Sequence, residues 1–71
     1  MAKYFIREES ELGQDLLEIV AQAMGLIEND EPLTKTKILE VVNDIIRSAK
    51  GIRSRLTIFD QYELSNYKVV E

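Results

Sequence analysis

The stretch from Leu33 to Gly51, LTKTKILEVVNDIIRSAKG, constrains the fold more than any other part of this sequence. Its apolar residues recur at alternating spacings of three and four, which is the period of one face of an α-helix. Thr34 stands where an N-cap residue is expected, and Leu33 and Ile38 have the spacing of a hydrophobic staple. We therefore predict a helix that begins directly after Thr34.

Two endings fit this helix. In the first, Arg47 and Lys50 occupy the last turn, and Gly51 is the left-handed residue that ends the helix. In the second, the apolar spacing continues through Ile52 and Leu56, so that one long helix passes through Gly51. We predict a break or kink at Gly51.

The C-terminal part then forms a third helix over Ile52 to Leu64. Its aromatic and β-branched residues also suit strands, as do those of KYFIRE near the N-terminus. A small sheet built from the two terminal segments is therefore the alternative.

An earlier helix is indicated between residues 10 and 27. Ser10 is a suitable N-cap, acidic residues cluster around the first turn, and Pro32 ends the polar segment that follows. The helical stripe consists of Leu12, Leu16, Ile19, Ala23 and Leu26.

The helix after Thr34 carries more apolar surface than one neighbouring helix can cover, because Leu39 and Ile46 flank its stripe on one side and Val41 on the other. The chain has 71 residues and no cysteine or histidine, which excludes disulfides and the usual zinc sites. We predict a single all-α domain over residues 1–71, either a helical hairpin or a three-helix arrangement, that forms a homodimer. The alternative is an α+β fold with short terminal strands.

The net charge of −4 is unevenly distributed. Residues 1–33 carry eight acidic and two basic residues, whereas residues 34–71 carry five acidic and seven basic residues. Overall acidity argues against binding to nucleic acid, which depends on neutralising phosphates. No apolar run approaches the length of a membrane span or a signal peptide, so we expect a cytoplasmic protein without membrane contact.

Residues suited to catalysis are few. Glu28, Asp30 and Glu31 could bind a cation, but they lack the spacing of a calcium loop and are better explained as a solvated turn. No nucleophile is paired with a base, so we expect neither enzymatic activity nor a cofactor.

The basic run RSAKGIRSR is the best candidate for a binding site, because it contains no acidic residue. It could bind an acidic protein surface or phosphate, and a solvated helix end explains it equally well. The candidate partner-binding residues are Arg47, Lys50, Arg53 and Arg55.

Three short motifs resemble a known family. They are Tyr4-Phe5, the sequence ELGQ from Glu11 that opens one helix, and Leu33 followed by Lys35, Lys37 and Ile38, which opens another. This pattern is similar to the small enterobacterial biofilm and acid-resistance regulators of the AriR/YmgB and Bdm type, over the first two-thirds of the chain. The resemblance implies a short helical protein, often dimeric, that connects to two-component signalling and has no catalytic residues.

Together these features predict a small non-enzymatic regulatory protein that acts by protein–protein binding. Two alternatives stay open: a nucleic-acid-binding transcriptional regulator that uses the basic run, and a small phage- or plasmid-type inhibitor of a host protein. The sequence does not identify the partner.

Overall fold

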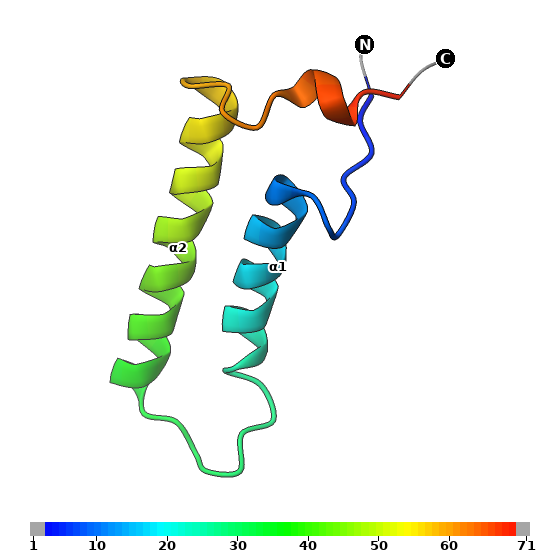
Figure 1. Ribbon diagram of the computed structural model, residues 1–71. Coiled ribbons are helices and arrows are strands. Elements are labelled where there is room, and N and C mark those ends of the chain that lie inside the picture. The colour runs from blue at the N-terminus through cyan, green and yellow to red at the C-terminus, as the bar shows by residue number, and fades with distance from the viewer. Residues whose placement is uncertain (1–2, 70–71) are drawn as a thin grey trace.

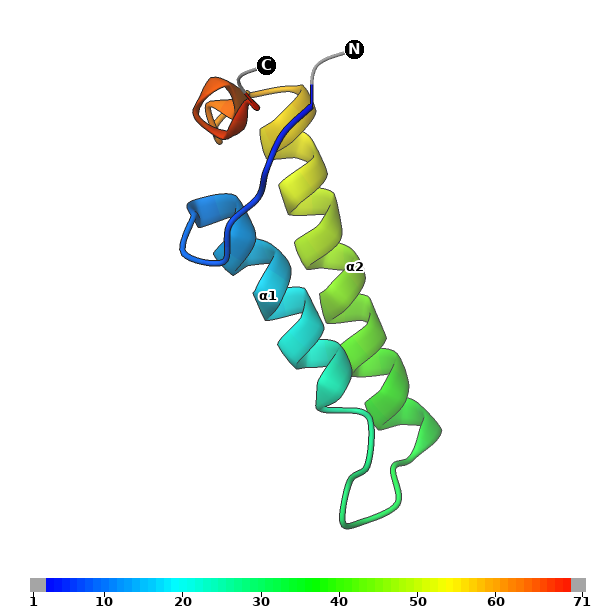
Figure 2. The same ribbon diagram turned by 90° about the vertical axis from the view of Figure 1, so that its right-hand side faces the viewer.

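The protein is a helical hairpin, as predicted. The computed structural model describes residues 3–69, and the hairpin consists of α1 (Glu11–Met24) and α2 (Lys35–Thr57). A short 3₁₀-helix, η1 (Leu64–Tyr67), follows α2. The two long helices run antiparallel and side by side (Figures 1 and 2).

Both helices begin at the predicted caps. The Ser10 hydroxyl accepts a hydrogen bond from the Gly13 amide at 3.0 Å, and the Thr34 hydroxyl accepts one from the Lys37 amide at 3.1 Å. Each contact satisfies an amide that has no partner within its own helix. The side chains of Ser10 and Thr34 thus determine where the helices start.

The predicted break at Gly51 is wrong. Helix α2 continues through Gly51 to Thr57, and no glycine among the described residues has a positive φ. The continuous apolar spacing explains this outcome, since a break would remove Ile52 and Leu56 from the face that packs on α1. That loss outweighs the cost of one glycine in a helix interior, about 1 kcal/mol.

The predicted third helix over residues 52–64 is also wrong, because its first part belongs to α2 and the rest is a turn. Asp60 and Glu63 adopt left-handed conformations in this turn, with φ of 46° and 49°. The terminal segments do meet, as the alternative required, but within residues 3–69 they form one isolated antiparallel bridge between Tyr4 and Lys68 and no sheet.

The buried core lies at one end of the hairpin. We call this the closed end: it contains the start of α1, the end of α2, η1 and the terminal segments, and the loop of residues 25–34 lies at the opposite, loop end (Figure 1). Leu12, Ile52 and Tyr62 are 2 %, 9 % and 3 % exposed. Partly buried apolar residues pack around them: Ile19, Leu56, Leu64 and Tyr67.

Two glycines provide a matched test of this fold. A Cβ on Gly51 would meet no atom within 4 Å, whereas a Cβ on Gly13 would lie 2.0 Å from the backbone oxygen of Arg7. We expect Gly51→Ala to stabilise the protein by about 0.5–1 kcal/mol through helix propensity, and Gly13→Ala to destabilise it. Urea denaturation followed by circular dichroism measures both, and a loss of stability in Gly51→Ala would contradict a helix that is continuous at this position.

Candidate functional site

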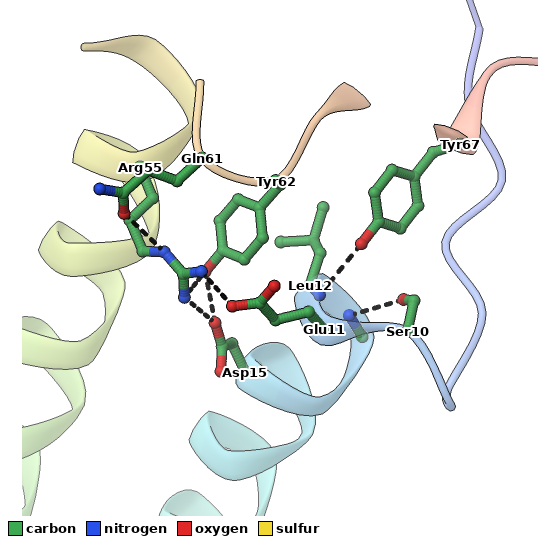
Figure 3. Close-up of polar contacts among 9 residues, drawn as sticks. Ser10, Glu11, Leu12, Asp15, Arg55, Gln61, Tyr62 and Tyr67 are labelled. Carbon is green, nitrogen blue, oxygen red and sulfur yellow. Dashed lines mark hydrogen bonds and ion pairs between the residues drawn. The ribbon is translucent and has the colours of Figure 1, made fainter. Parts of the chain in front are cut away.

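Arg55 joins three segments at the closed end. Its guanidinium donates hydrogen bonds to Asp15 at 2.6 Å and to the Tyr62 hydroxyl at 3.1 Å, and it also pairs with Glu11. Its Nε donates to the Gln61 side chain at 3.1 Å. The central carbon of the guanidinium lies 4.0 Å from the centre of the Tyr62 ring. Figure 3 shows these side chains converging from α1, α2 and the turn before η1. We call this group of five side chains the Arg55 cluster.

The geometry of the cluster follows from helix spacing. Glu11 and Asp15 are four residues apart and therefore lie on the same side of α1, one turn above the other. A guanidinium has five N–H donors in a planar fork, so it can bind both carboxylates at once. The two carboxylates are thus held by a single cation from the other helix.

Tyr62 is the buried member of the cluster. Its hydroxyl donates to the same Asp15 oxygen that accepts from Arg55, at 2.5 Å. Burial raises the pKa of Tyr62 to about 12, and the hydrogen bond to Asp15 acts in the same direction. The hydroxyl is therefore protonated at neutral pH and serves as a hydrogen-bond donor that fixes the turn against α1.

Tyr67 attaches η1 to the same helix start. Its hydroxyl accepts a hydrogen bond from the Leu12 amide at 3.3 Å (Figure 3). The Phe5 amide donates a hydrogen bond to the Tyr67 carbonyl at 2.8 Å, which joins the N-terminal segment to η1. These two contacts hold the N-terminal segment, η1 and the start of α1 together.

The structure divides the predicted partner-binding residues. Arg55 points into the cluster, whereas Arg47, Lys50 and Arg53 are exposed on α2. Arg47 contacts Asp44 at 3.3 Å, and its side chain is 81 % exposed. In the part of the chain that the structure describes, no ion pair involves Lys50 or Arg53.

A second surface, which the sequence predicted only as excess apolar area on α2, extends over both helices. A groove marks one side of the helix contact, and the residues that line it include Asp15 and Glu18 of α1 and Ser48 and Arg55 of α2. The hairpin has a second face on the side away from this groove. Apolar residues of α1 and α2 that point to that side lie together on this second face.

Helix geometry places such residues there. Successive residues of an α-helix are rotated by about 100°, so on α1 Leu16 and Val20 lie across the buried stripe from Asp15 and Glu18. On α2, the same rotation of 100° per residue places Ile46 and Arg55 on opposite sides of the stripe that contains the buried Ile52. The two sets therefore form one surface. We call it the apolar face, and it comprises Leu16, Val20 and Met24 of α1 and Leu39, Val42 and Ile46 of α2.

The apolar face is open to solvent. Apart from the half-buried Val42, its side chains are between 38 % and 58 % exposed. Near the closed end it continues into a shallow groove that Ile6 shares with Leu16, Leu17 and Val20. Contiguous apolar surface of this kind marks binding sites in soluble proteins.

The sequence also raised the questions of a metal-ion site and of a membrane-spanning helix. No group of three or more carboxylates within residues 3–69 is arranged to hold a metal ion, and this includes Glu28, Asp30 and Glu31. Neither long helix combines the length and the apolar composition needed to cross a bilayer, as far as the described chain extends.

No family model matches the sequence, and no curated protein or solved structure is significantly similar to it. The resemblance to the biofilm and acid-resistance regulators stays a prediction.

Sequence reasoning missed the Arg55 cluster. It assigned the acidic residues near Glu11 to the helix dipole and Arg55 to an exposed basic run. The available signal was the four-residue spacing of Glu11 and Asp15 in the acidic half, opposite an arginine of the basic half. This signal can be used only once it is known that the start of α1 lies beside the end of α2.

Tyr62→Phe tests the cluster through its pH dependence. Because the pKa of Tyr62 is about 12 in the folded protein and 10.0 as its ordinary value, the folded state keeps the proton to higher pH. The resulting stability is complete below pH 10 and is lost as the pH rises towards 12. We expect wild-type protein to lose about 2–3 kcal/mol more than Tyr62→Phe over this range, measured by urea denaturation. Parallel curves for the two proteins would contradict the cluster.

Proposed function

We propose that this chain is a small non-enzymatic regulatory protein that acts by binding protein through its apolar face. The observation that carries the proposal is the contiguous exposure of large apolar side chains from two helices, among them Val20 at 53 % and Ile46 at 45 %. Leaving such side chains in water costs free energy that burial against a protein would recover, about 25 cal/mol per Å².

The exposed basic residues support a protein partner. By helix geometry Arg53 lies about 20° from Ile46 around α2, and Lys50 about 40° from it, so both border the apolar face. Charged residues at the rim of an apolar surface are common in protein interfaces, where they orient the partner and exclude others. Arg55 is left out of this set because its side chain is held in the Arg55 cluster.

A nucleic-acid function receives less support. Three basic residues remain exposed on the run once Arg55 is assigned to the cluster, and one of them, Arg47, contacts Asp44. A signalling connector and an inhibitor of a host protein would both act by protein binding, so the proposal covers either role.

Site-specific photo-cross-linking in the native host tests the proposal. A photoreactive amino acid at Ile46 should form covalent adducts with protein, since the side chain would lie inside an interface. The control position is Ile58, which is 72 % exposed and lies about 120° around the helix from Ile46. We expect adducts at Ile46 and few at Ile58, detected by gel mobility and identified by mass spectrometry. Equal labelling at both positions, or none at Ile46, would argue against the apolar face as a binding surface.

A further inference from the structure

The apolar face lacks the covering layer that a third helix would give it. The protein measures 48 × 23 × 19 Å and consists of a single layer of two antiparallel helices along most of its length (Figure 2). It exposes 5990 Å², whereas a compact protein of 8.2 kDa normally exposes about 4,500 Å². The third α-helix that the sequence predicted does not form within residues 3–69, so no further α-helix of the described chain covers this face.

The backbone of the hairpin suits a helical partner. A strand binds by extending an exposed sheet edge, and residues 3–69 contain one isolated bridge and no sheet. A helix satisfies its own backbone hydrogen bonds, so it can lie on an apolar surface without leaving polar groups unpaired. Packed against Leu16 and Val20 of α1 and against Val42 and Ile46 of α2, it would bury apolar side chains of both helices.

Basic residues lie at both ends of this face. Around α2, Lys35 and Arg53 lie about 20° from Ile46, and Lys50 lies about 40° from it. Lys35 is the first residue of α2, at the loop end, whereas Lys50 and Arg53 lie towards the closed end. All three side chains are exposed and form no ion pair within the described residues. They are therefore free to bind acidic groups of a partner.

The acidic residues of the two helices point away from this face. Those of α1 lie on the side of the hairpin that carries the Arg55 cluster, and two of them pair with its guanidinium. Those of α2, Glu40 and Asp44, lie about 120° and 160° around the helix from Ile46. Beside the face, the N-terminal segment adds one residue of each sign, Arg7 and Glu8. The face is thus positive, although the whole chain has a net charge of −4.

We propose that the apolar face binds an amphipathic helix of another protein, with acidic residues at both ends of the apolar stripe of that helix. The bound helix would extend from Lys35 to Arg53, a distance of about 27 Å that corresponds to about 18 residues. The inference rests on the proposed function, because it states the class of protein segment that the apolar face binds.

Two other occupants match the charges less well. A second copy of the chain would bring the same three cations to the interface, and like charges that face one another cost binding free energy. An anionic bilayer is an extended negative surface, which would repel the rest of a chain with a net charge of −4. The charge of an acidic helix is local, so the cations of the face attract it with less repulsion from the acidic side of the hairpin.

Two synthetic peptides test the proposal. Each has about 20 residues and the same apolar stripe at helical spacing, with glutamates at both ends of the stripe in the first peptide and lysines in the second. Fluorescence anisotropy of the labelled peptides at about 150 mM salt measures binding. We expect the acidic peptide to bind at least about 10-fold more tightly, because it forms ion pairs where the basic peptide meets like charges. Equal binding of the two peptides, or binding of neither, would overturn the proposal.

Matched charge-reversal variants of the protein locate the effect. Lys50→Glu combined with Arg53→Glu should abolish the preference for the acidic peptide. The control, Lys37→Glu combined with Arg47→Glu, makes the same change of net charge at positions about 180° and 100° from Ile46, and it should keep the preference. All four side chains are exposed, so both variants should keep their helical circular dichroism. The same loss of preference in both variants would indicate an effect of overall charge and contradict binding at this face.

Further outcomes separate the occupants, and separate this inference from the proposed function. Binding to vesicles of anionic phospholipid, or a dimer in sedimentation equilibrium, that is lost in Ile46→Glu would replace the acidic helix with a membrane or a second copy. In the native host, mass spectrometry of the Ile46 photo-adducts should identify an acidic amphipathic segment. Adducts with a protein segment of another kind would overturn this inference while the proposed function stands. The absence of adducts at Ile46 would overturn both.

Discussion

The rest of the structure depends on the contact of Arg55 with Asp15 and Tyr62. Arg55 comes from the last turn of α2, Asp15 from the second turn of α1, and Tyr62 from the turn that follows α2. Because one guanidinium binds all three segments, it sets which turn of α1 lies beside which turn of α2. It also brings the Tyr62 ring over Leu12 and Ile52, the other two buried apolar residues. Two left-handed residues, Asp60 and Glu63, bend the chain back to make this possible, at a cost of about 1 kcal/mol each.

This organisation stabilises one end of the hairpin and leaves the other end open. The buried residues lie at the closed end, whereas Met24, Ile27 and Leu39 near the loop end are each about half exposed. The same helices that are ion-paired on their polar side therefore present an uncovered apolar side. A protein bound on the apolar face would cover the side chains that the hairpin leaves exposed. Fold and proposed function share one cause: α2 carries more apolar surface than α1 can cover.

Local signals in the sequence were sufficient for part of the fold. Ser10 and Thr34 determined both helix starts because capping is a contact within four residues. The end of α2 could not be decided in the same way, since Gly51 and the apolar spacing on either side of it favour opposite outcomes, and only the burial of Ile52 against α1 resolves them. The Arg55 cluster joins residues 40 and 47 positions apart, which no local pattern encodes. Excess apolar surface on α2 was visible in the sequence, but its continuation onto Leu16 and Val20 required the observed packing of the helices.

Amide hydrogen exchange along both helices tests most directly whether the Arg55 cluster secures the closed end. In the wild-type chain, amides on both sides of Leu12 and Ile52 should be the most protected, and amides near Met24 and Leu39 should exchange faster, because local opening reflects local burial. In Tyr62→Phe, protection at the closed end should fall, while exchange near Met24 and Leu39 should change little. Equal protection of both ends in the wild-type chain, or unchanged protection at the closed end of Tyr62→Phe, would contradict this role of the cluster.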